Sequence, residues 1–464
     1  MKSFIFLSRH ALVHAGICVI AGMLACSNAQ ESDGITFGAA GWMQYSVIGK
    51  SSDSVAIPGF YKGGLDGKSV FSSGAQISMV AQPSEKLHVS AGVGMAAGNT
   101  LSGGLHVSSG YAPSGVDAYV ANANFTYLFQ NTANSKVSVT GGLFNYDYNP
   151  DAKNLGLYLL RGPVYPGILI SGFETKHVMP VANMLGLQLH HQMGAFRQDL
   201  LLSSDMEYYP FFDLSPAYVA GYQVHRTLHI GAGVNFYHLL PVDSKLTSGQ
   251  NPDGGRWTYA DPLDTVGGKK PDTTNLSFNG TKVMANASFD PKPLFGGAEW
   301  LGPEDLKLYG EVALLGLDND KAHKKIYGDY LHRMPVMVGF NLPTRKTLDH
   351  LSLEVEWYAS ANADNLDKYN VIGHPISPYP TNWDLDPNTG NRYLARRAIR
   401  DNWKWSLHGA RTIQKHVLLS FQVANDHYRP GIFDGYADSN PPHRDAVLVT
   451  PKDWYFTTKL AYFF

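Results

Sequence analysis

Strict alternation of apolar and polar residues is the feature that most constrains the fold of this chain. The segments 87–95, 228–236, 351–357 and 417–423 switch between apolar and small or polar residues at nearly every position. Successive side chains of a β-strand point to opposite faces, so each segment predicts a strand with one apolar and one polar face. Such strands must pair through their backbones, and the chain is therefore predicted to be all-β.

The last residues, 453–464, carry this alternation to the end of the sequence. Trp454, Phe456, Leu460, Tyr462 and Phe464 fall on one face. Chain ends are usually polar and frayed, so an apolar face at the end predicts a strand held on both sides. We expect it to pair with the first strand and to close the sheet on itself, as a sheet in hydrocarbon requires.

Short and long connections alternate between the expected strands. Short turns fall at 82–85, 131–135, 225–226 and 414–415, and long loops at 49–70, 98–115, 238–275, 361–400 and 425–452. This pattern is typical of a closed antiparallel up-and-down transmembrane β-barrel. We expect about sixteen strands, or eighteen if 200–209 adds a pair. The sixteen are predicted near 34–48, 71–82, 86–97, 117–130, 135–145, 166–176, 183–200, 214–224, 226–237, 276–289, 305–317, 333–341, 348–360, 401–412, 415–425 and 453–464.

The amino-terminal region predicts export. A basic start, an apolar run over 11–24 and small residues before position 30 indicate a signal peptide spanning 1–29. The remaining chain, 30–464, is then a single barrel domain. A membrane anchor and lipoprotein processing at Cys26 are the alternatives.

Composition agrees with a membrane barrel. Only 16% of the residues are charged, and the chain holds 47 Gly, 26 Tyr and 22 Phe, which suits many turns and aromatic girdles. The formal net charge of −2 gives no basic excess for a nucleic-acid partner. Beyond the predicted signal peptide no apolar run is long enough for a spanning helix. We expect no metal and no cofactor.

The end of the chain resembles the carboxy-terminal signature of bacterial outer-membrane porins, in which alternating apolar residues close on a terminal Phe. The resemblance is to the porin class as a whole. It implies the outer membrane of a Gram-negative bacterium, contact with its lipids and lipopolysaccharide, and possible assembly as a homotrimer. It also implies that Tyr462 and Phe464 form the signal read by the barrel-assembly machinery.

Polar residues on the inward faces are the candidate pore lining, because a barrel of this size encloses water. Their charges are of both signs, so we expect weak ion selectivity at most; plain solvation of a wide lumen is the alternative. By parity the inward set includes Lys136, His229, Asn235, Lys307, Glu311, His350, Glu354, Glu356, Lys404, His408 and Lys459.

The connection after the fifth strand, 146–167, is unusually apolar. Its leucines predict burial against a surface such as the barrel wall, and "AKNLGLYLLR" predicts a short helix over 152–161. In general porins the third external loop folds inward and narrows the pore, so the resemblance implies a constriction here. An external loop packed on a neighbouring subunit is the alternative. The candidate constriction residues are Asp147, Asp151, Lys153 and Arg161.

A basic cluster and several loop aromatics mark the expected mouth of the barrel. The cluster could attract anions or lipopolysaccharide phosphates, or be a solvated loop. Trp257 and Tyr379 could stack on sugar rings or pack between loops. The basic cluster consists of Arg392, Arg396, Arg397 and Arg400.

Taken together, these features predict a water-filled porin for passive diffusion of small hydrophilic solutes, sugars among them. The alternative is a structural or adhesion barrel whose lumen is plugged by loops. No Ser/His or Asp/His constellation is recognisable in the sequence, so we do not expect an enzyme.

Overall fold

The computed structural model describes most of the chain. The described residues are 34–50, 54–57, 61–64, 66–67, 69–102, 116–162, 165–169, 173–175, 181–204, 212–248, 258–260, 273–275, 278–296, 299–317, 329–359, 383–385, 392–394, 402–426 and 452–464. The predicted signal peptide 1–29 lies outside them, as do the loop aromatics Trp257 and Tyr379.

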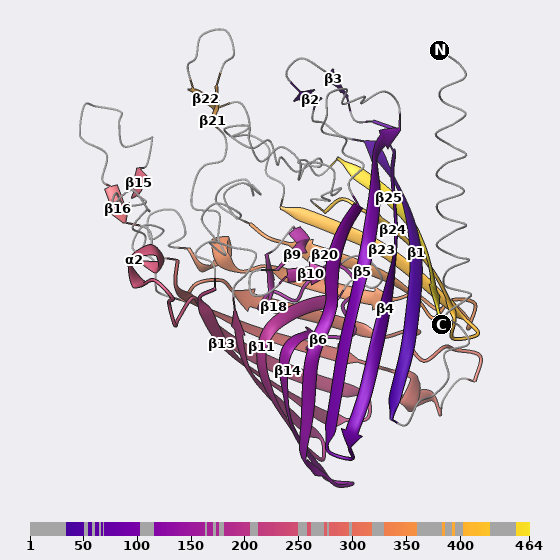
Figure 1. Cartoon of the computed structure of the whole chain (residues 1–464). Helices are drawn as coiled ribbons and strands as arrows, with labels where there is room; N and C mark the ends of the chain where they lie inside the picture. Colours follow the sequence, from indigo (N-terminus) through magenta and orange to yellow (C-terminus); the bar gives the residue numbers. More distant parts are fainter. Residues whose placement is uncertain are drawn as a thin grey trace.

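Sixteen antiparallel strands close into one barrel within these residues, which confirms the predicted fold class. Figure 1 shows them as a wall of tilted strands. They are β1 (Ile35–Lys50), β4 (Ser69–Ser84), β5 (Leu87–Ser102), β6 (Val116–Asn131), β7 (Ser135–Tyr146), β11 (Val181–Met193), β12 (Phe196–Ser204), β13 (Leu214–His225), β14 (Leu228–Tyr237), β17 (Gly280–Phe289), β18 (Leu308–Leu314), β19 (Val336–Asn341), β20 (His350–Trp357), β23 (Trp403–Ile413), β24 (Val417–Ala424) and β25 (Trp454–Phe463).

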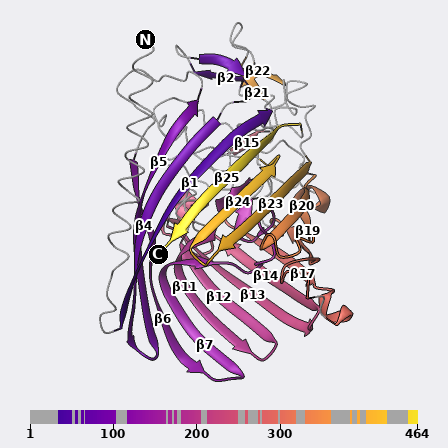
Figure 2. The same cartoon turned by 90° about the vertical axis from the view of Figure 1, so that its right-hand side faces the viewer.

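The last strand closes the sheet. β25 pairs with β24 on one side and with β1 on the other, where Gln44 lies opposite Lys459. Figure 2 shows β25 between these two strands. The terminal Phe464 N–H donates to the carbonyl of Ala39 over 2.8 Å. The predicted pairing of the first and last strands is confirmed, and the barrel has no free edge.

Short pieces of structure lie in the connections. The strand pieces are β2 (Ser54–Ile57), β3 (Tyr61–Gly64), β8 (Arg161–Gly162), β9 (Tyr165–Leu169), β10 (Phe173–Thr175), β15 (Thr258–Ala260), β16 (Thr273–Asn275), β21 (Trp383–Leu385) and β22 (Arg392–Leu394), and the helical pieces are α2 (Ser244–Thr247), η1 (Lys292–Phe295) and η2 (Tyr330–Arg333). Over the described ranges, no helix has the length and apolar character needed to cross a bilayer.

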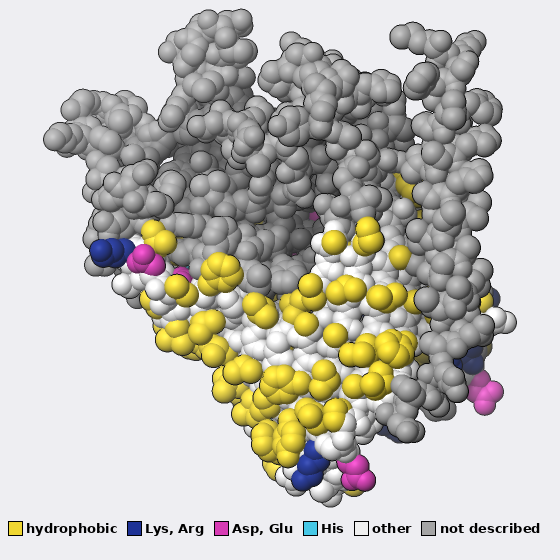
Figure 3. All heavy atoms as spheres, viewed as in Figure 1, with side chains coloured by type: hydrophobic (Ala, Val, Ile, Leu, Met, Phe, Trp, Pro, Cys, Tyr) yellow, Lys and Arg dark blue, Asp and Glu magenta, His cyan; other side chains and the backbone are white. Residues whose placement is uncertain are grey.

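Alternation separates an apolar outer face from the interior. On β25 the odd-numbered Tyr455 and Ala461 are buried, whereas the even-numbered Trp454 and Tyr462 are exposed. Around the barrel large apolar side chains remain uncovered on the outward parity, with Phe129 57% exposed. Figure 3 shows the apolar side chains of one face in rows across the strands. Exposed apolar area of this extent marks a surface in contact with another apolar phase.

The connections differ in length at the two ends of the barrel. Residues 85–86, 132–134, 194–195, 226–227 and 414–416 form tight turns at one end, which we call the short-turn end. The opposite, long-loop end carries the connections that follow β1, β5, β7, β14, β20 and β24.

Two predicted strands are wrong, although the count of sixteen is right. The segment 166–176 adds no strand to the barrel, because β9 pairs only with β8 and β10 forms a small hairpin with the start of β11. The segment 183–200 is two strands, β11 and β12, joined at Gly194 with a φ of 55°. Glycine adopts this left-handed conformation readily, and a two-residue turn there leaves the alternation almost unbroken on both sides.

Candidate functional site: the loop inside the barrel

The segment 147–162, the inner loop, lies against the interior face of the barrel. Leu155, Tyr158 and Leu159 are at most 1% exposed and form one apolar cluster with the inward-facing Met284 and Met337. The predicted burial of this apolar loop against the barrel wall is confirmed. Burying the leucines on methionines of the wall removes apolar surface from water and stabilises the docked loop.

The helix predicted over 152–161 is wrong. Gly156 and Leu157 have positive φ values of 86° and 58°, which an α-helix does not allow. Within the loop, the Arg161 N–H donates to the Leu157 carbonyl as in an α-helix, and the Leu160 N–H donates to the same carbonyl as in a 3₁₀ turn. The amides of Tyr158 and Leu159, which in a helix would donate to the carbonyls four residues earlier, donate instead to Glu311 and to the Tyr148 hydroxyl.

Glu354 on β20 anchors the first half of the inner loop. Its Oε1 accepts from the amide of Lys153 over 2.5 Å and from the Tyr309 hydroxyl over 2.9 Å. Its Oε2 accepts from the amides of Asn154 and Leu155 over 2.9 and 2.8 Å. The carboxylate is 1% exposed. Four donors on a buried carboxylate satisfy its hydrogen-bonding capacity.

Two further carboxylates anchor the second half. Glu311 on β18 accepts from the Tyr148 hydroxyl over 2.8 Å, from the Asn149 side-chain amide over 2.9 Å and from the Tyr158 amide over 2.7 Å. Glu356 on β20 accepts from the Tyr158 hydroxyl over 2.9 Å. Burial raises the pKa values of Tyr148 and Tyr158 well above the usual range of tyrosine, and the neighbouring carboxylates add to this. Both hydroxyls therefore stay protonated and remain donors.

The wall also supplies donors to the loop carbonyls. Lys282 Nζ on β17 donates to the carbonyls of Tyr158 and Leu159 over 3.1 and 3.3 Å. Asn235 on β14 donates to the Leu159 carbonyl over 2.9 Å. Lys404 on β23 is buried and lies opposite Glu356 in the sheet register. Donors and acceptors of the loop backbone thus meet charged or amide groups of the barrel, as buried backbone requires.

The four candidate constriction residues lie in this loop in different environments. Asp151 forms an ion pair with Lys307 at 3.2 Å, and Lys153 Nζ turns back to the Pro150 carbonyl at 2.6 Å. Asp147 is exposed, whereas Arg161 is 4% exposed, with Nη1 donating to the Asn154 carbonyl. Of the four, Asp151 and Lys153 are half-buried.

Six of the candidate lining residues, Lys136, His229, Glu354, Glu356, Lys404 and His408, fall on the inward parity of the register, but their surroundings differ. Glu354, Glu356 and Lys404 are buried by the inner loop and the wall. His408 shares a hydrogen bond of 2.8 Å with the ring of His350. The remaining two are Lys136, which is exposed near the short-turn end, and His229, which lines a cavity.

The predicted basic mouth cluster is largely outside the described residues. Arg392 begins β22, of which the structure describes the backbone. Arg396, Arg397 and Arg400 lie outside the described ranges.

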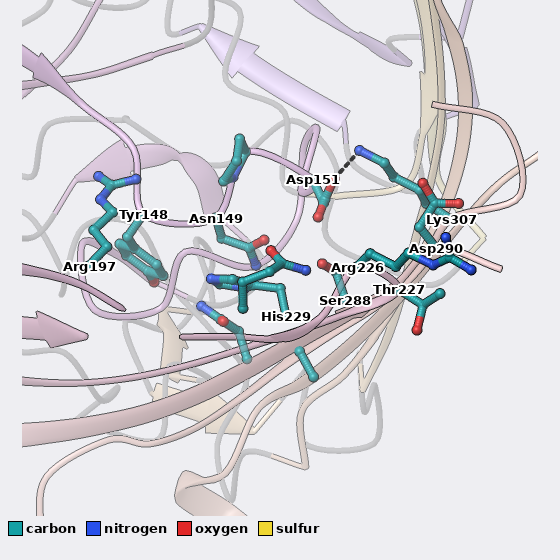
Figure 4. Close-up of a pocket in the computed structure, with 14 residues that line it drawn as sticks. Tyr148, Asn149, Asp151, Arg197, Arg226, Thr227, His229, Ser288, Asp290 and Lys307 are labelled. Carbon is teal, nitrogen blue, oxygen red and sulfur yellow. Dashed lines mark hydrogen bonds and ion pairs between the residues drawn. The ribbon is translucent and has the colours of Figure 1, made fainter. Parts of the chain in front are cut away.

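A cavity of about 340 Å³ lies between the inner loop and the short-turn end. Figure 4 shows Asp151 and Lys307 joined across it, with His229, Ser288 and Arg226 in the same lining. We call it the turn-side cavity. Sequence reasoning did not single out Arg197, Arg226 or Asp290, which stand in or near turns where parity is hard to assign. The lining consists of Tyr148, Asn149, Pro150, Asp151, Arg197, Gln223, Arg226, Thr227, His229, Asn286, Ala287, Ser288, Asp290 and Lys307.

Lys307 connects the inner loop to the short-turn end. Its Nζ lies 3.2 Å from Asp151 and 2.8 Å from Glu304. Burial alone would lower the pKa of Lys307, but the hydrogen bond that its Nζ donates to Glu304 and the negative charge of Asp151 outweigh this effect, and the pKa is raised. The lysine therefore stays cationic and keeps both ion pairs at neutral pH.

The wall on the other side of the lumen is polar. Inward side chains of β1, β4, β6, β24 and β25 bond one another: Ser46 to Thr457 at 2.7 Å, Gln422 to Tyr455 at 2.8 Å and Tyr119 to Gln76 at 3.4 Å. The barrel interior thus has one wall under the apolar loop and a second wall on which hydroxyl and amide groups lie beside a small apolar cluster of Ala40, Trp42 and Ala461. Within the described part of the chain, no cluster of three or more His, Cys, Asp or Glu side chains is arranged to hold a metal ion.

Comparison with known proteins gives structural likenesses alone. No protein-family model matches the chain, and no curated protein matches it. A variant of the porin of Rhodopseudomonas blastica matches with a TM-score of 0.41 and 8% identity over 93% of this chain and 100% of its own. OprB of Pseudomonas putida matches with a TM-score of 0.48 and 10% identity over 93% of this chain and 94% of its own.

Proposed function

We propose that this chain is an outer-membrane porin that lets small hydrophilic solutes diffuse through its lumen past the inner loop. The observation that carries the proposal is a closed sixteen-strand barrel that is apolar outside, polar along one inner wall and partly filled by a docked loop. A sheet can cross hydrocarbon only when every strand is paired on both sides. Barrels of this strand number enclose an aqueous channel.

The ends of the barrel suggest its orientation. In bacterial barrels the short turns face the periplasm and the long loops face the outside. The short-turn end would then be periplasmic, with Tyr462 and Phe464 at its rim. The centroids of their rings are 4.5 Å apart. We propose that these two residues form the assembly signal. We also propose that the long loops contact lipopolysaccharide, that the basic mouth cluster takes part in this contact, and that the protein assembles as a homotrimer.

The solute class follows from the polar wall. The side chains that bond one another along it are hydroxyls and amides, which both donate and accept hydrogen bonds and suit hydroxylated solutes such as sugars. Asp151, Lys153 and Lys307 would line the narrowest part beside the inner loop, with the exposed Asp147 at its edge. The buried Arg161 would support the loop backbone through the Asn154 carbonyl. Charges of both signs there favour weak ion selectivity.

A plugged structural barrel is the second candidate. The apolar packing of the inner loop, with Tyr158 and Leu159 completely buried, is the observation that favours it. A loop that fills the lumen from wall to wall would stop solutes, whereas a loop docked on one wall leaves the polar wall open.

Single-channel recording in planar bilayers tests the proposal. Refolded protein is added to one side, and liposome swelling with sugars of increasing size is measured in parallel. We expect stepwise current and swelling that falls with solute size. A folded barrel that gives neither current nor swelling would overturn the porin and leave the plugged barrel.

A further inference from the structure

We infer that the turn-side cavity binds the carboxylate of a small hydroxylated acid, held by Arg226 with His229 and Ser288. This inference rests on the proposed function, because it places a solute subsite on the diffusion path. Polar cavities of a few hundred Å³ are the usual size for small-molecule sites, and this one has about 340 Å³.

Most charges of the cavity are already neutralised. Lys307 is paired with Asp151 and with Glu304. Arg197 is paired with Asp199 through both Nε and Nη2, at 3.1 and 3.0 Å. These groups are therefore committed to the protein.

The remaining lining acid is neutralised as well. Asp290 pairs with Lys292 at 2.9 Å, and the amide of Lys292 also donates to it. The cavity therefore presents no free carboxylate that would repel an anion.

Arg226 is the exception among the lining charges. Its guanidinium donates to the carbonyl of Pro293 over 3.2 Å and forms no ion pair within the described part of the chain. The cavity is lined by the cations Arg197, Arg226 and Lys307 against the acids Asp151 and Asp290. Arg226 is thus the lining cation that has no carboxylate partner among these ion pairs, and its guanidinium keeps unused donors.

Two neutral groups accompany this cation. His229 and Ser288 lie opposite each other in the β14–β17 register, and both face the cavity. Neither side chain makes a hydrogen bond to the described residues. His229 leans over Gly221, where an added Cβ would come within 2.8 Å of its Nε2. The glycine therefore leaves room for the ring to reach into the cavity.

The chemistry of these groups favours a monocarboxylate. A guanidinium binds a carboxylate through two parallel N–H···O bonds, and an imidazole and a hydroxyl can complete its hydrogen bonds. The neighbouring Asn286, Thr227 and Gln223 provide amide and hydroxyl groups for the hydroxyls of the same solute. One guanidinium without an ion pair matches one carboxylate.

The test compares two probes with the same carbon skeleton, sodium D-gluconate and D-glucose. Each is added at the short-turn side during single-channel recording, and binding to the refolded protein is measured by calorimetry. We expect gluconate, and glucose much less, to interrupt the current and to bind saturably. Loss of a charge-assisted bidentate contact in Arg226→Gln is expected to weaken gluconate binding by about tenfold or more.

Arg411→Gln is the matched control. Arg411 lies near the same end, on the outward parity of β23, and bonds the Lys346 carbonyl and Asp349. The Arg411→Gln substitution removes the same charge, but Arg411 does not line the cavity, so gluconate binding should not change. Equal binding of both probes, or gluconate binding that survives Arg226→Gln, overturns the inference. Absence of current with Arg226-dependent gluconate binding would overturn the porin and leave the subsite standing.

Discussion

Replacing Glu354 with glutamine tests whether buried carboxylates hold the inner loop. Each oxygen of Glu354 accepts two hydrogen bonds, Oε1 from Lys153 and Tyr309, and Oε2 from Asn154 and Leu155. A glutamine side chain keeps the shape but turns one oxygen into an NH₂ donor. Whichever way the amide is oriented, two of the four hydrogen bonds are lost, and the new NH₂ group faces the two donors that the oxygen had accepted from.

The size of the effect follows from those two bonds. Hydrogen bonds to a charged group contribute about 1.5–3 kcal/mol each, so Glu354→Gln is expected to weaken loop docking by about 3–6 kcal/mol. At about 1.4 kcal/mol per tenfold, the lower figure already raises the undocked population roughly a hundredfold. The barrel itself should persist, because its strand pairing does not involve this side chain.

Hydrogen exchange measured by mass spectrometry reads the result directly. The amides of 153–155 are expected to lose about two orders of magnitude of protection, and single-channel conductance should rise or become noisy. Glu85→Gln removes the same charge from an exposed turn between β4 and β5 and should change neither. Unaltered exchange at 153–155 in the Glu354 variant would refute the anchoring role.

Three further predictions follow from individual contacts. Tyr158→Phe removes the hydroxyl that donates a hydrogen bond to Glu356. Chemical denaturation should show that the free energy of unfolding falls by about 1–3 kcal/mol; an unchanged midpoint and slope would contradict this. Asp151→Asn removes one partner of Lys307 and makes the lumen more positive. The reversal potential in a KCl gradient should therefore shift toward the equilibrium potential of chloride, and a shift toward that of potassium would contradict the prediction. Deletion of Phe464 is expected to reduce insertion into the outer membrane in cells while refolding in detergent is kept; equal loss of both would indicate a purely structural role.

Alternation was enough to predict the barrel, because each inward or outward position is set by parity alone. It identified the pairing of the first and last strands and placed Glu311, Glu354 and Lys404 on the inner face. It could not find the turn at Gly194, since a two-residue turn leaves the period nearly intact. It also mistook the apolar run at 166–170 for a barrel strand, because apolar content alone does not distinguish a barrel strand from a short strand outside the barrel, such as β9.

The backbone conformation of the inner loop could be predicted only in part from its own sequence. Leucines at 155, 157, 159 and 160 predicted burial correctly, because apolar area has to leave water wherever it lies. The helix was wrong because Gly156 and Leu157 have positive φ values, and because the Tyr158 amide donates to the carboxylate of Glu311, which lies 153 residues later in the chain. Periodicity describes neighbours in sequence, and this competition between distant groups has no local signature.

The position of the anchors has a consequence for the order in which the barrel forms. The amides of 153–155 are separated from Glu354 by 199 to 201 residues, and that of Tyr158 from Glu311 by 153. Contacts this far apart form only after the intervening chain has been ordered. Until β18 and β20 join the sheet, the carboxylates stay hydrated and the leucines of the loop have no surface to cover. Docking of the loop is therefore expected to be a late step that follows strand pairing, and pulsed exchange during refolding should show protection at 153–155 only after the strands are protected. A barrel that is closed but still has its loop free is then the last species before the native state, and its lumen is wider than that of the finished protein.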